Sequence, residues 1–234
     1  MQNHQIVSRD AWVEARRALL AEEKAFTAAR DRLAERRRAL PWVRVDKPYG
    51  FDTADGRKSL ADLFAGRGQL VVYHFMFDPS WEAGCKSCSF WADQFDGIAV
   101  HLAQRDVALA AVARAPLPQL DAFRRRMGWR FPLVSSFGGD FNHDFQVSFS
   151  AEELQRGVVT YNYAQRPMQS PEMPGISVFL RDGGQVFHTY SAYARGLDML
   201  NATYQLLDLV PKGRDETGLS YPMAWVRHHD AYGA

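Results

Sequence analysis

The sequence predicts an α/β fold with a mixed central sheet flanked by helices and preceded by a long N-terminal helix. Strand-like apolar runs alternate with helical segments over residues 69–127, and strands connected by helices in this way are parallel. The run 176–180 is followed by the turn Asp182-Gly183-Gly184 and a second strand-like run, 185–190. This spacing predicts an antiparallel hairpin, so the sheet is mixed.

The composition is typical of one large domain with extensions. The hydrophobic fraction of 47% is sufficient for a packed core, and the net charge of +1 gives no reason to expect a nucleic acid or an anionic membrane as partner. No run reaches the ~18 apolar residues of a membrane span, and the first ten residues lack an apolar signal segment, so we expect a cytoplasmic protein. We divide the chain into a helical extension (1–40), a central domain (41–212) and a tail (213–234).

The extension is predicted to be one helix, capped by Ser8 or Asp10 and ending near Ala39. Its apolar residues recur at every seventh position, and charged residues interrupt the intermediate positions of this stripe. The stripe is therefore not a clean coiled-coil seam. Two interpretations stay open: the helix packs on its own domain, or it forms the arm of a homodimer. The stripe consists of Trp12, Leu19, Phe26, Leu33 and Leu40.

The remaining elements follow from periodicity and turn signals. The uncharged run 69–77 is expected to be a central strand that is covered on both faces. Residues 135–173 give the weakest pattern, and the motif 228–230 is expected to lie in a solvated tail. Other predicted strands are 42–45, a hairpin around Asp55-Gly56, 106–113, 131–134 and 158–163, and other predicted helices are 60–64, 85–104, 119–127 and 197–209.

Cys85 and Cys88 are the only cysteines in the chain, and they open the helix that follows the central strand. A close pair in a chain expected to be cytoplasmic is typical of redox or metal chemistry. The first turn of a helix carries the positive end of its dipole, and Lys86 adds a positive charge, so both favour a thiolate at Cys85. We therefore assign Cys85 as nucleophile and Cys88 as resolving thiol of a thiol–disulfide oxidoreductase.

This arrangement resembles the thioredoxin-like oxidoreductases. It implies a thioredoxin-like sheet and places Pro174 where those proteins have a cis-proline that faces the dithiol, although the isomer cannot be read from sequence. The chain is also similar to a bacterial thioredoxin-like family of uncharacterised function, catalogued as predicted dithiol–disulfide oxidoreductases. The segments that carry this similarity are 40–42, 73–77, 85–93, 126–129, 140–142 and 186–190.

The resemblance implies further roles around the dithiol. Asp78 is our choice for a carboxylate that moves a proton, with a loop turn as the alternative role, and Trp81, Gly84, Lys86 and Trp91 are predicted to contact the substrate. Gly84 departs from thioredoxin, which has an aromatic residue at this position. No bound cofactor is expected, because the electrons come from a partner dithiol. The substrate is a protein or small-molecule disulfide or dithiol.

Two other functions are alternatives. Peroxiredoxins share the scaffold, but the places of their motif proline and hydroxyl residue are held here by Asp78 and Glu82. A non-enzymatic binding or metal-carrier module could combine the two cysteines with a distant histidine, for which His188 is the best candidate. Since one CxxC supplies only two ligands, we assign no metal site.

Overall fold

The computed structural model describes residues 4–233, which belong to two units that meet between Pro41 and Trp42. The first unit contains α1 (Arg9–Arg38), and the Ser8 side chain caps it by accepting a hydrogen bond from the N–H of Ala11 at 3.2 Å. The predicted helix and one of its two predicted caps are therefore confirmed. The division at 40, 212 and 234 into three segments stays a prediction.

Within its own unit, the side chains of the apolar stripe of α1 stay exposed. Trp12 is 48% and Phe26 71% exposed, and no residue of α1 is buried. A stripe of this kind is what the arm of a homodimer would present to a second copy. The homodimer through α1 stays a prediction.

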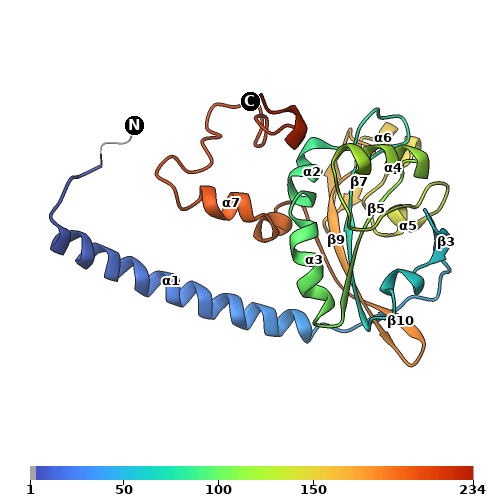
Figure 1. Cartoon of the computed structure of the whole chain (residues 1–234), viewed down its shortest axis with the longest axis horizontal. Helices are drawn as coiled ribbons and strands as arrows, with labels where there is room; N and C mark the ends of the chain where they lie inside the picture. The colour runs from blue at the N-terminus through green and yellow to red at the C-terminus, as the bar shows by residue number, and fades with distance from the viewer. Residues whose placement is uncertain (1–3, 234) are drawn as a thin grey trace. The chain divides into compact units, whose positions relative to one another are not determined.

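The second unit is built on an eight-stranded sheet of order β1-β10-β9-β4-β5-β6-β2-β3 (Figure 1). β4, β5 and β6 are parallel, whereas β9 pairs antiparallel with both β4 and β10. The central order β10-β9-β4-β5, with helices between β4 and β5, is the thioredoxin-like arrangement, so the predicted fold class is confirmed. The strands are β1 (Val43–Arg44), β2 (Gly50–Thr53), β3 (Gly56–Ser59), β4 (Gln69–His74), β5 (Val107–Ala113), β6 (Leu133–Ser135), β9 (Gly175–Asp182) and β10 (Gln185–Tyr193).

Helices lie between and after these strands, and a separate two-stranded sheet, β7 (Val158–Tyr161) with β8 (Ala164–Pro167), occupies the segment whose pattern was weakest. None of the helices among residues 4–233 has the length and hydropathy that crossing a membrane requires. The helices of the second unit are η1 (Asp62–Phe64), α2 (Lys86–Ala92), α3 (Phe95–Ala103), α4 (Leu117–Arg126), α5 (Phe141–Asp144), α6 (Ala151–Gln155), η2 (Ala194–Leu200), α7 (Ala202–Leu207) and η3 (His229–Ala231).

Two helices predicted as continuous are each divided. The helix expected over 85–104 is interrupted between α2 and α3, where the Asp93 carboxylate accepts a hydrogen bond from the indole N–H of Trp129 at 2.8 Å. The helix expected over 197–209 is interrupted at Asn201, whose side chain caps α7. At Asn201 the extended backbone lets the side chain cap the next helix, which a continuous helix would not allow.

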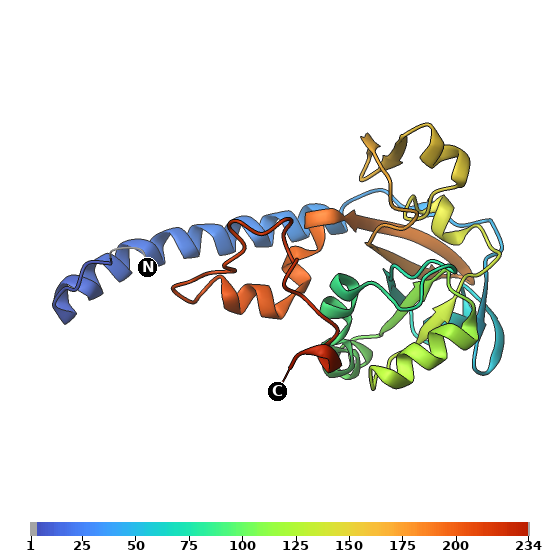
Figure 2. The same cartoon turned by 90° about the horizontal axis from the view of Figure 1, so that it is seen from above.

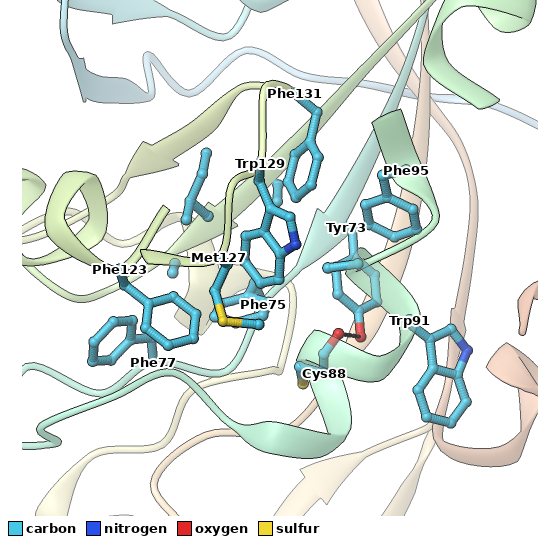
Figure 3. Packing of buried hydrophobic residues seen from close by; sticks show 14 of the residues in the cluster. Tyr73, Phe75, Phe77, Cys88, Trp91, Phe95, Phe123, Met127, Trp129 and Phe131 are labelled. Carbon is cyan, nitrogen blue, oxygen red and sulfur yellow. Dashed lines mark hydrogen bonds between the residues drawn. The ribbon is translucent and has the colours of Figure 1, made fainter. Parts of the chain in front are cut away.

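Successive residues of β4 point to opposite faces of the sheet, and each face has its own apolar core. Tyr73 belongs to the core that also contains Cys88 (Figure 3). The helices α2, α3, α4 and α7 contribute residues to this core and cover this face. Leu70 and Val72 belong to the second core, which β2, η1 and α5 cover. Burial on both faces explains why the strand carries no charge, as the sequence predicted.

Candidate redox-active site

The dithiol lies just beyond the carboxyl end of β4, where the chain turns into α2. Cys85 is the N-cap of α2, and its backbone N–H donates to the carbonyl of Met76 at 2.9 Å. Its own carbonyl accepts the N–H of Ser89 at 2.9 Å, which starts the helix. The Cys85 side chain therefore leaves the backbone beside the unpaired N–H groups of the first turn.

The two thiols have opposite environments. Cys85 is half-buried and Cys88 is buried, and both are free. A hydrogen bond from Cys88, together with the N–H groups of Cys88 and Ser87, outweighs burial and lowers the pKa of Cys85 to about 6. Burial and the neighbouring Cys85 raise the pKa of Cys88 well above that of an ordinary thiol. At neutral pH, the negative charge of the pair therefore lies on Cys85.

Two buried tyrosines accompany the dithiol, and the sequence analysis did not identify either of them. The hydroxyl of Tyr73 is 3.5 Å from the carbonyl oxygen of Cys88. Burial raises the pKa of Tyr73 and of Tyr161, and the electrostatic interaction of each phenol with Cys88 raises it further. Tyr161 is also the link to Pro174, since its hydroxyl donates to the Pro174 carbonyl at 2.7 Å.

Pro174 immediately precedes β9, as predicted. No peptide bond among residues 4–233 is cis, so the bond before Pro174 is trans. Pro174 therefore lies directly before β9, as predicted, but it lacks the cis peptide bond that the resemblance implied.

Gly84 is buried directly before the nucleophile, and its environment explains why no aromatic residue stands there. A Cβ atom added to Gly84 would lie 2.5 Å from the ring of Phe75 and 2.9 Å from the ring of Phe123. The space that a side chain would need is thus already filled by the first core. Gly84 contributes only backbone, and its carbonyl oxygen lies 2.8 Å from Nε2 of His228.

The side chains of the other residues predicted to contact substrate make contacts within the protein. Lys86 Nζ donates to the carbonyl of Ala224 at 3.2 Å. Trp91 is only 6% exposed, and its indole N–H donates to the carbonyl of Leu197 at 2.9 Å, so it is a core residue and not part of an open substrate surface. Trp81 is partly buried against the same core.

Asp78 lies in the loop between β4 and α2, as expected, but its carboxylate is used locally. Oδ1 accepts hydrogen bonds from the backbone N–H of Ser80 at 2.9 Å and from its hydroxyl at 2.6 Å. This is the loop-turn role that the sequence left as the alternative. The proton-moving role of Asp78 stays a prediction.

Glu172, two residues before Pro174, is a buried carboxyl that the sequence analysis missed. It is 1% exposed, it accepts a hydrogen bond from the Ser148 hydroxyl at 2.7 Å, and its Oε1 lies 3.2 Å from Nη1 of Arg114. Burial outweighs both partners and, with the charge of Asp78, raises the pKa of Glu172 to about 7. No local pattern could have identified it, because Ser148 and Arg114 come from distant parts of the chain.

The raised pKa of Glu172 predicts a measurable dependence of stability on pH. An acid whose pKa is higher in the folded protein stabilises it below the unfolded pKa and loses this effect as pH rises through the folded pKa. A shift from 4.5 to about 7 corresponds to a loss of roughly 3 kcal/mol between pH 4 and 8. In Glu172→Gln this component should be absent, as urea denaturation across that range can measure. The exposed Glu82→Gln variant is the control, and equal pH profiles for Glu172→Gln and wild type would contradict the prediction.

The histidine considered as a metal ligand lies in a different environment from the dithiol. Nε2 of His188 is 2.7 Å from the hydroxyl of Ser191. Hydrogen bonds connect this hydroxyl to Ser177, and Ser177 to the buried His74. The His188 ring packs on Phe145 and Phe179, next to the second core. Among residues 4–233, no three His, Cys, Asp or Glu side chains are grouped so that they could hold a metal ion.

The chain therefore has a thioredoxin-like fold, with a CxxC at the start of the helix that follows strand β4. It belongs to a family described as a bacterial protein of unknown function (DUF899), whose family model matches residues 1–232. No curated protein matches the chain.

Several solved structures are distantly similar. Peroxidoxin BcpB from Mycobacterium tuberculosis has 16% identity and a TM-score of 0.48, over 71% of this chain and 97% of that protein. Peroxiredoxin Q from Xanthomonas campestris has 17% identity and a TM-score of 0.41, over 68% and 87%. The hypothetical protein SMc02350 from Sinorhizobium meliloti has 12% identity and a TM-score of 0.40, over 63% and 68%. Similarity this distant gives no argument about the activity of this chain.

Proposed function

We propose that this protein is a thiol–disulfide oxidoreductase in which Cys85 attacks and Cys88 resolves. The observation that carries the proposal is the position of the half-buried Cys85 at the N-cap of α2, with the buried Cys88 one turn further along the helix. The lowered pKa of Cys85 and the raised pKa of Cys88 agree with this placement. A lowered pKa supplies the thiolate that attacks a disulfide, and a raised pKa keeps the second thiol protonated until it is needed.

The proposed exchange has two balanced steps. The Cys85 thiolate attacks one sulfur of a disulfide, forms a mixed disulfide and releases the other half of the substrate as a thiolate. Cys88 then loses its proton and attacks the Cys85 sulfur, which releases the second half and leaves a Cys85–Cys88 disulfide. The two electrons gained by the substrate come from the dithiol, and an external dithiol restores it. This chemistry requires no bound cofactor.

The experiment is a trapping reaction with reduced protein and bis(2-hydroxyethyl) disulfide, followed by mass spectrometry. Wild type should form the internal disulfide, whereas Cys88→Ser should accumulate the mixed disulfide on Cys85. Cys85→Ser should stay unmodified, because its remaining thiol is buried and protonated. Equal modification of Cys85→Ser and wild type would overturn the proposal.

Hydrogen peroxide in place of the disulfide tests the alternative of a peroxidase. A peroxidase would oxidise Cys85 to a sulfenic acid and release water, after which Cys88 would form the disulfide and release a second water. The residues at the peroxiredoxin motif positions do not favour this reaction, because Asp78 is bonded to Ser80 and Glu82 is exposed. Rapid consumption of peroxide, together with slow reaction of the disulfide, would favour the peroxidase.

A further inference from the structure

Residues 216–230, which we call the strap, are an ordered segment of the C-terminal part of the chain. Oε1 of Glu216 accepts hydrogen bonds from the hydroxyl of Tyr204 at 2.7 Å and from the indole N–H of Trp225 at 2.8 Å. Val226 is fully buried, and the ring of Trp225 packs edge-on against Phe90 of α2 at 5.5 Å. Around residues 228–230, where a solvated tail was expected, His228 is half-buried, whereas His229 and Asp230 are exposed.

The strap contacts both neighbours of the nucleophile. On the N-terminal side of Cys85, Nε2 of His228 lies 2.8 Å from the carbonyl oxygen of Gly84. On the other side, Lys86 Nζ donates to the carbonyl of Ala224 at 3.2 Å. The strap thus lies alongside the start of α2, and both views place the C-terminal segment next to this helix (Figures 1 and 2).

Two polar contacts hold the end of the strap. Asp230 forms a bidentate ion pair with Arg126 of α4, at 2.8 and 2.9 Å. Nδ1 of His229 lies 2.7 Å from Oδ1 of Asp93, in the break between α2 and α3. A bidentate pair fixes the orientation of its partners as well as their distance. Together, the two contacts hold the end of the strap against α4 and against the break between α2 and α3.

We infer that the strap restricts the dithiol to small disulfides and keeps the disulfides of folded proteins away from Cys85. This inference rests on the oxidoreductase function proposed above. The attacking sulfur has to reach the sulfur of its target, so a folded protein has to bring its own backbone against the surface around Cys85. The strap already engages the backbone carbonyl of Gly84 on one side of this residue and the side chain of Lys86 on the other. A small disulfide can approach the half-buried Cys85 without bringing a folded surface against the strap.

The first test uses alkylation, which does not depend on disulfide exchange. Cys85 is labelled with iodoacetamide or with a polyethylene glycol maleimide, in wild type and in the double variant Arg126→Ala/His228→Ala. The double variant should accelerate the large reagent roughly tenfold relative to the small one, since weaker contacts raise the open population of the strap. Arg125→Ala, an exposed neighbour on the same helix, is the control and should leave both rates unchanged. A ratio that does not change in the double variant overturns the inference.

The second test uses two disulfide substrates. Wild type should reduce bis(2-hydroxyethyl) disulfide and leave insulin disulfides near the background rate, and Arg126→Ala/His228→Ala should gain insulin reduction. Rapid insulin reduction by wild type, or no gain in the variant, overturns the role of the strap. If neither substrate reacts, the proposed function fails, while the alkylation ratio still decides whether the strap controls access. Thermal unfolding verifies that each variant is folded.

Discussion

Alkylation of Cys85 by iodoacetamide should increase with pH through a midpoint near 6, far below the pKa of about 8.5 of a free cysteine. The thiolate is the reactive form, so the rate follows its population. The midpoint is a better diagnostic than the rate at one pH, because the intrinsic nucleophilicity of a thiolate falls as its pKa falls. At neutral pH these two effects largely cancel.

Serine variants of each cysteine show which of the two thiols is labelled. Cys85→Ser should reduce labelling to background, because Cys88 is buried and its pKa is raised. Cys88→Ser should keep labelling at Cys85. In that variant the midpoint reports how much of the lowered pKa comes from the neighbouring sulfur, which is its largest cause. A wild-type midpoint near that of a free thiol, about 8.5, would contradict Cys85 as the nucleophile.

The parts of the fold that the sequence predicted are those with local causes. The strand before the dithiol is an uncharged apolar run, and the turn motif Asp182-Gly183-Gly184 predicts the hairpin of β9 and β10. The position of Cys85 at a helix N-cap follows from the same local pattern. Each of these features depends on residues that are close together in sequence, so periodicity and turn chemistry are sufficient.

The parts that the sequence did not predict depend on contacts between distant residues. Tyr161, in the small second sheet, interacts electrostatically with Cys88, and Glu172 receives its raised pKa from burial among residues of other segments. The break after α2 is stabilised by Trp129, which lies 36 positions away from Asp93. The strap reaches Gly84 across 144 positions. No local window contains both members of such a pair, so propensity and period could not indicate them.

Gly84→Ala should destabilise the protein by about 1–3 kcal/mol, the usual cost of placing an extra carbon into a filled core. The added Cβ atom would lie 2.5 Å from the ring of Phe75, which is itself packed against Phe123 and Trp129. For a domain of this size, each kcal/mol lowers the melting temperature by roughly 2–4 °C. Calorimetry or thermal circular dichroism can measure the loss.

Gly97→Ala is the matched control, because Gly97 lies within α3 and an added Cβ atom would meet no other atom within 4 Å. Alanine is the better helix former by about 1 kcal/mol, so this variant should be at least as stable as wild type. If both alanine variants had the same melting temperature, close packing would not be the reason for glycine before Cys85. If only Gly84→Ala loses stability, the aromatic residue of thioredoxins has no room here. The surface directly before Cys85 then consists of the Gly84 backbone, whose carbonyl is bonded to His228 of the strap. An aromatic side chain at this position would require the rings of Phe75 and Phe123 to pack elsewhere.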